Sequence, residues 1–202
     1  MKKSHLYRIT AYLFGLSILA LGITLVFRAN LGVGAWDALI FALARLTGLT
    51  AGTWIIIVGI FILIVNALLL KKRLDLPALL TIFLLGILVD FWFRSTSIPS
   101  LSVPMHYALF TLGLLITAFG IAIYTQAHFA ITPIDRLMFV IQSKTGYSLR
   151  VSRFISEGFA LVLAFLFHGP IGIGTIIVTI LIGPLIQFFI SSIQFLSKYS
   201  TR

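Results

Sequence analysis

Repeated runs of consecutive apolar residues constrain this chain more than any other feature of its sequence. Several of these runs reach about 20 residues, the length at which an α-helix crosses a hydrocarbon core of ~30 Å. A water-soluble domain needs more surface charge than this chain offers, since 60% of its 202 residues are hydrophobic and only 10% are charged. We therefore expect an all-α, polytopic membrane protein.

The apolar runs divide into six long segments and two short ones. We expect membrane-spanning helices over residues 9–27, 53–70, 77–93, 106–126, 149–167 and 171–195. The first run is longer than the apolar core of a signal peptide, so we expect it to remain as an uncleaved span. Segments 37–47 and 135–145 each have 11 residues, and such a helix is only about 16 Å long. We expect both to be re-entrant half-helices that do not cross the bilayer.

The two halves of the chain repeat each other at an offset of 135 − 37 = 98 residues. Glycine, acidic and Thr-Gly positions recur in this one register: Gly15 with Gly113, Gly22 with Gly120, Asp37 with Asp135, and Thr47-Gly48 with Thr145-Gly146. Chance produces matching apolar residues in membrane sequences more readily than matching Gly and Asp positions. We expect a repeat at 1–98 and a second at 99–202, together forming one membrane domain.

The basic residues predict how the chain is oriented in the membrane. With six spans and a cytoplasmic N-terminus, only Arg28, Arg45 and Arg94 face outward, and 15 − 3 = 12 basic residues face inward. The positive-inside rule favours this arrangement. Three spans per half is an odd number, so the second half is expected to be inverted relative to the first. Both termini are then cytoplasmic, and two inverted repeats with discontinuous helices are typical of secondary transporters.

Three motifs resemble those of a known group of bacterial proteins. They are Leu31-Gly-x-Gly-x-Trp-Asp37, Thr132-Pro-Ile-Asp135, and Gly172-Ile-Gly-Thr-Ile176 followed by Gly183-Pro184. The chain resembles the YczE/YyaS/YitT class of bacterial integral membrane proteins over most of its length. The resemblance implies a bacterial plasma-membrane protein and leaves its biochemistry open, because that class is functionally uncharacterised.

Asp37 and Asp135 are the leading candidates for binding a substrate or an ion, because the chain has only five acidic residues. Thr132, Pro133 and Asp135 fit the N-cap, N1 and N3 positions of a helix, so capping alone explains Asp135. Asp37 follows Gly34, a weaker cap. The functional alternative is a pair of carboxylates presented to a cation or proton inside the membrane. An acid can cap a helix and also bind an ion.

Other residues are weaker candidates for the same site. Trp36 offers an aromatic wall for an organic cation, and Asn30 and His128 occupy equivalent positions in the two halves. Four polar residues are candidates for a proton relay: Glu157, Asp90, Gln187 and Arg136. Local ion pairs are the structural alternatives: Asp90 with Arg94, Glu157 with Arg153, and Arg136 with Glu157 or Asp135.

Several functional classes are excluded or disfavoured. The chain has no Cys, which removes thiolate chemistry, and we expect neither a metal site nor a cofactor. It lacks the common nucleotide-binding and hydrolase motifs, so we do not expect an enzyme. The net charge of +10 reflects membrane topology rather than nucleic-acid binding, since the basic residues lie at the ends of apolar runs.

Three hypotheses for function remain. The first is a small secondary transporter or exporter with its substrate, cation or proton site between the half-helices. The second is a membrane substrate-binding subunit that depends on a separate energised partner. The third is a structural or assembly factor. The expected partners are the lipid bilayer and an unknown small molecule or cation, with a homo-oligomer or a partner subunit also compatible.

Overall fold

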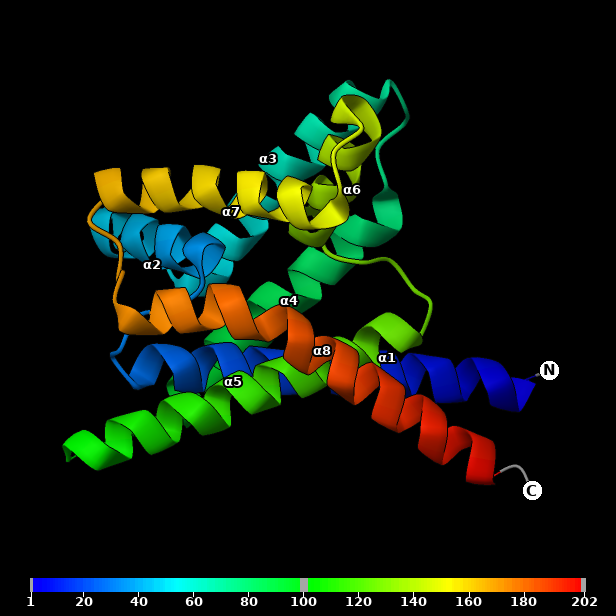
Figure 1. Ribbon diagram of the computed structural model, residues 1–202, viewed down its shortest axis with the longest axis horizontal. Helices are drawn as coiled ribbons and strands as arrows, with labels where there is room; N and C mark the ends of the chain where they lie inside the picture. The colour runs from blue at the N-terminus through cyan, green and yellow to red at the C-terminus, as the bar shows by residue number, and fades with distance from the viewer. Residues whose placement is uncertain (1, 99–101, 201–202) are drawn as a thin grey trace.

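A computed structural model describes residues 2–98 and 102–200, and all regular structure in this part of the chain is α-helical. The helices are shown in Figure 1: α1 (Lys2–Arg28), α2 (Ala35–Thr47), α3 (Ala51–Leu70), α4 (Leu76–Ser95), α5 (Val103–Gln126), α6 (Pro133–Thr145), α7 (Leu149–Leu166) and α8 (Ile173–Ser200). The predicted all-α class is confirmed. The predicted boundary between halves, after residue 98, adjoins residues 99–101, which lie outside the described residues.

Five helices within the described ranges are long and apolar enough to cross a membrane: α1 from Arg8 onward, α3, α4, α5 and α8. The predicted helical membrane protein is therefore supported at this level. Helix α7 has 18 residues but carries Arg150, Arg153 and Glu157. The sixth span, the re-entrant placement of the short helices and the orientation of the termini stay predictions.

The two short helices, α2 and α6, each have 13 residues and begin 133 − 35 = 98 residues apart. Both helices start two residues before the first residue of the predicted segment, and both end at its last residue, Thr47 or Thr145. Each is terminated by a glycine in the left-handed region, Gly48 at φ 75° and Gly146 at φ 76°. Residues with a Cβ rarely adopt this conformation, so glycine ends both helices at the same point.

Helices α1 and α5 pack side by side and antiparallel (Figure 1). Their backbones approach so closely that a Cβ on either of two α1 glycines would collide with α5: Gly15 with Tyr124 and Gly22 with Thr117. The same contacts recur between equivalent positions of the two halves. Adding 98 to each glycine's number and subtracting 98 from its partner's gives Gly113 with Val26 and Gly120 with Leu19, which also lie in contact. The four glycines of the repeat therefore serve helix packing, because small residues allow such an approach.

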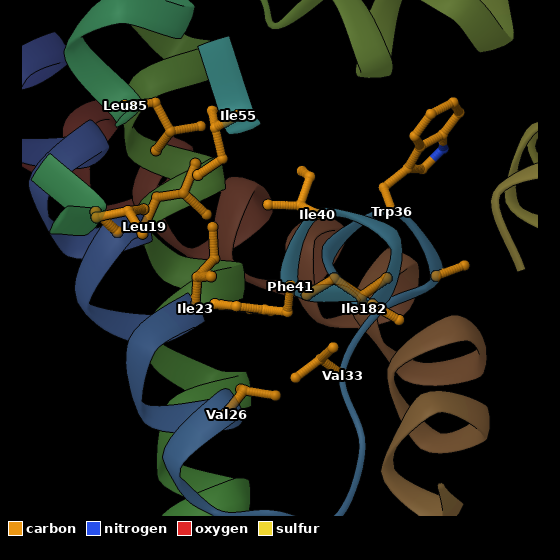
Figure 2. Close-up of a cluster of buried hydrophobic side chains, with 14 of the residues drawn as sticks. Leu19, Ile23, Val26, Val33, Trp36, Ile40, Phe41, Ile55, Leu85 and Ile182 are labelled. Atoms are coloured by element: carbon orange, nitrogen blue, oxygen red, sulfur yellow. The ribbon is translucent and has the colours of Figure 1, made fainter. Parts of the chain in front are cut away.

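The buried core centres on α2. Figure 2 shows its apolar side chains meeting those of neighbouring helices, including Ile23 of α1, Ile55 of α3, Leu85 of α4 and Ile182 of α8. Each short helix also packs against the third helix of the other half, α2 against α7 and α6 against α3. These contacts between the halves hold them together and place the N-termini of both short helices inside the protein.

Candidate functional site

A cavity of about 150 Å³ lies where the two short helices begin. All eight helices contribute residues to its wall. Asp37 and Asp135 both line it, together with Glu157 and Arg153 from α7. The two acids that the sequence singled out therefore lie around one cavity, although they are 98 residues apart.

Most of the cavity wall consists of positions that correspond between the two halves. Eight pairs at the offset of 98 line it: Leu19/Thr117, Ile23/Ile121, Gly34/Thr132, Ala35/Pro133, Trp36/Ile134, Asp37/Asp135, Ile55/Arg153 and Gly59/Glu157. Two of these pairs combine an uncharged residue of α3 with a charged residue of α7. The cavity is thus lined by equivalent positions of the two halves and is unequal in charge, with the extra charges on the α7 side.

Asp135 is held by hydrogen bonds. Its carboxylate accepts one from the Tyr124 hydroxyl at 2.7 Å and one from the Thr132 hydroxyl at 2.7 Å. Its backbone N–H donates to the Thr132 hydroxyl oxygen at 3.1 Å. The predicted helix start at Thr132 is confirmed, and the carboxylate has a structural role at the α6 N-terminus.

Asp37 occupies the equivalent position of α2 without equivalent support. Its cap residue is Gly34, which provides no side-chain hydrogen bond to the helix start. No hydrogen bond to the Asp37 carboxylate is found within the described part of the chain. A carboxylate inside a protein normally has a partner, because an unpaired one loses its solvation without compensation. Helix capping therefore explains the presence of Asp135 but not that of Asp37.

Glu157 links α7 to the start of α2. Its carboxylate lies near the backbone N–H of Ala35 and interacts electrostatically with Arg153, one turn earlier on α7. A carboxylate at a helix N-terminus satisfies N–H groups that have no partner inside the helix. Glu157 supplies to α2, from the other half, part of the support that Gly34 does not provide.

Trp36 is only 6% exposed, and its indole N–H donates to the Ser156 hydroxyl of α7 at 3.2 Å. Figure 2 shows the ring directed away from the Ile40 side of α2. Trp36 lines the cavity, yet much of its surface is used in packing α2 against α7.

Two further predicted residues line larger hollows outside the central cavity. Asn30 belongs to a hollow of about 450 Å³ that also includes Asp90, called here the Asp90 hollow. His128 belongs to one of about 610 Å³ that includes Asp75, the Asp75 hollow. Both residues adopt left-handed conformations, φ 52° for Asn30 and φ 55° for His128. Their equivalence in the sequence reflects equivalent turns after α1 and α5.

Three predicted relay residues lie away from the cavity. Asp90 accepts hydrogen bonds from the Thr50 hydroxyl at 2.6 Å and the Gly52 N–H at 2.8 Å, so it caps α3. Arg136 forms an ion pair with Asp75 rather than with either acid expected from the sequence. Gln187 is exposed on α8. Only Glu157 of the four relay candidates reaches the cavity.

Residues 6–191 match the sequence model described as "Family of unknown function (DUF6198)". The chain belongs to the DUF6198 family. It is 38% identical over 191 residues to the uncharacterized protein YyaS of Bacillus subtilis, covering 93% of this chain and 95% of that protein. It is 36% identical over 205 residues to the uncharacterized membrane protein YczE of the same bacterium, covering 100% and 94%.

A third relative of this DUF6198 chain is an uncharacterized protein of Haemophilus influenzae, 31% identical over 186 residues and covering 92% of this chain and 84% of that protein. The predicted resemblance to the YczE/YyaS class is confirmed. No solved protein structure matches the chain.

Sequence reasoning did not identify every polar residue that shapes the site in this DUF6198 protein. Tyr124 was missed as a partner of Asp135, and Arg153 was considered only as an ion-pair partner on α7. Comparing the two halves could have identified Arg153 and Glu157 as site residues, because they correspond to the uncharged Ile55 and Gly59 of α3. A charged residue whose repeat partner is apolar or glycine points to a site that differs between the halves.

Proposed function

We propose that this protein is a small secondary transporter or exporter of the plasma membrane whose central cavity binds a small monovalent cation or a proton. The observation that carries the proposal is the Asp37 carboxylate, which lines the cavity and has no hydrogen-bond partner among the residues that the structure describes. An acid placed inside a membrane protein is costly to keep and is therefore usually functional.

The charges around the cavity favour one positive charge as the occupant. Three carboxylates and one guanidinium line it, which gives a formal charge of −3 + 1 = −2. The N-termini of α2 and α6 each contribute a partial positive charge of roughly 0.5. The remaining charge is about −1. One proton or one monovalent cation neutralises it, and the two compete for the same carboxylates, which provides the basis for exchange.

The paired elements support a mechanism of alternating access. In this proposal the halves are inverted repeats, and α2 and α6 are re-entrant helices that approach the cavity from opposite faces. The antiparallel packing of α1 on α5 and the eight matched wall positions are what an inverted repeat requires. Two similar halves provide two packings of similar energy, one open to each side.

Purified protein in proteoliposomes with an imposed pH gradient tests this function. Wild-type protein is expected to dissipate the gradient when sodium, potassium or tetramethylammonium is added, as followed by an internal pH-sensitive dye. Asp37→Asn is expected to abolish this response. Asp90→Asn, which removes an acid outside the cavity, is the matched control and is expected to retain it.

Two results would count against transport. One is a wild-type response that survives unchanged in correctly folded Asp37→Asn. The other is thermal stabilisation by one of these cations without any flux, which would favour the substrate-binding subunit instead.

A further inference from the structure

An ion pair borders two hollows on the side of the protein that carries the α3–α4 loop. The Asp75 hollow, of about 610 Å³, is lined by Asp75, Arg136 and His128. A smaller chamber of about 50 Å³ shares Asp75 and Arg136 with it and reaches from the exposed Lys72 to the buried Asn66. The Arg136–Asp75 pair therefore forms part of the wall of both.

Asn66 connects the small chamber with the central cavity. It is buried, with 3% of its surface exposed, and its amide N–H donates to the Pro133 carbonyl at 2.9 Å. Pro133 in turn lines the central cavity. The Asn66 side-chain oxygen has no hydrogen-bond partner in the described part of the chain. An unpaired buried acceptor destabilises this closed arrangement relative to one in which water reaches it.

The opposite side of the protein is closed by backbone contacts instead. The Val33 N–H donates to the Pro170 carbonyl at 3.3 Å, and the Gly174 N–H donates to the Leu31 carbonyl at 2.7 Å. A Cβ at Gly172 would collide with the Leu31 backbone, so the two segments are in direct contact. These contacts are made by backbone atoms, whereas the Asp75 side has an ion pair between two side chains.

We infer that the Arg136–Asp75 ion pair is a gate on the route between the Asp75 hollow and the central cavity. This inference rests on the proposed transport function and adds how access to its site is controlled. Arg136 and Asp75 are 38% and 26% exposed, and ion pairs in water-accessible positions are weak enough to open and close readily. When the pair opens, the chamber beside Asn66 joins the hollow, and the Asn66–Pro133 contact lies between that chamber and the cavity.

The natural absence of Cys permits a direct test by labelling a single cysteine in membranes. Ile121→Cys places the reporter on the α5 wall of the central cavity, away from the gate. A small, charged methanethiosulfonate reagent is added to the Asp75 side of oriented vesicles, and the rate of modification is measured. Asp75→Asn or Arg136→Gln is expected to raise this rate by up to about fivefold, which corresponds to ~1 kcal/mol for an exposed ion pair.

Exchange of the two charges provides the decisive comparison. The double variant Asp75→Arg with Arg136→Asp is expected to return the labelling rate to that of the reporter alone. Lys72→Gln removes a charge from the same chamber without touching the pair, and is expected to leave the rate unchanged. Size-exclusion chromatography in detergent verifies that each variant is folded.

The results separate the gate from the transport function. A rate that is unaffected by the single variants, or one that stays high in the charge-exchanged variant, contradicts the gate. Absence of labelling in every folded variant contradicts the access route itself. If labelling depends on the gate but the protein shows no cation flux in proteoliposomes, the gate is supported and only the proposed transport function is rejected.

Discussion

Asp37 and Asp135 occupy equivalent positions in the two halves but differ in how they are supported. Asp135 has two hydroxyl donors and caps α6, whereas the described residues provide no hydrogen bond to Asp37. The N-terminus of α2 is therefore capped more weakly than that of α6. The Glu157 carboxylate, which lies near the Ala35 N–H, offsets part of this difference.

This difference predicts opposite effects of one substitution on stability. Asp135→Asn is expected to destabilise the protein by about 1–3 kcal/mol, because two hydrogen bonds to a charged group are weakened. Asp37→Asn is expected to be neutral or slightly stabilising, because it removes a half-buried charge that has no hydrogen-bond partner among the described residues. Thermal unfolding in detergent, with both variants measured side by side, checks the prediction. Equal losses in the two variants would show that Asp37 is also a structural cap.

The site was predictable from the sequence where its residues follow local rules. The pattern Thr132-Pro-x-Asp135 encodes its own helix start, and the repeat led from Asp135 to Asp37. Contacts between elements distant in the chain were not predictable in this way. Arg136 pairs with Asp75 and Tyr124 with Asp135 because of how the helices pack. The periodicity of the sequence does not indicate such contacts.

At the scale of elements, α1 and α5 depend on glycines at their interface. Gly22→Ala is expected to destabilise the protein by about 1–3 kcal/mol, because the added methyl group falls on the Thr117 backbone. Gly158→Ala on α7 is the matched control, since no atom lies within 4 Å of a Cβ there. The control is expected to be neutral or stabilising by up to ~1 kcal/mol, because Ala favours the helix. A denaturation series of both variants measures the difference, and equal effects would contradict close packing at Gly22.

The ends of the short helices were well predicted, and their partners were not. Glycine at 48 and 146 marks each C-terminus, because only the local backbone conformation is involved. The packing of α2 on α7 and of α6 on α3 crosses between halves. Both short helices are amphipathic, so their sequences indicate which face is buried but not which helix packs against it.

For the whole molecule, the charge distribution predicts which side of the membrane each loop faces. A single cysteine at Lys72 is expected to be unreactive toward an impermeant thiol reagent added to intact cells, whereas one at Arg94 is expected to react. Both positions are exposed, so burial does not explain a difference. Labelling at Lys72 from outside would overturn the inverted-repeat arrangement.

In the proposed mechanism a cation and a proton compete at Asp37, and proton release by the purified protein measures this competition. Addition of a cation that the protein binds to unbuffered wild-type protein in detergent is expected to release about one proton per ion, because the cavity accommodates one positive charge. Asp37→Asn is expected to release none, while Asp90→Asn behaves as the wild type. Cation binding without proton release, or release that persists in Asp37→Asn, would rule out competition at Asp37.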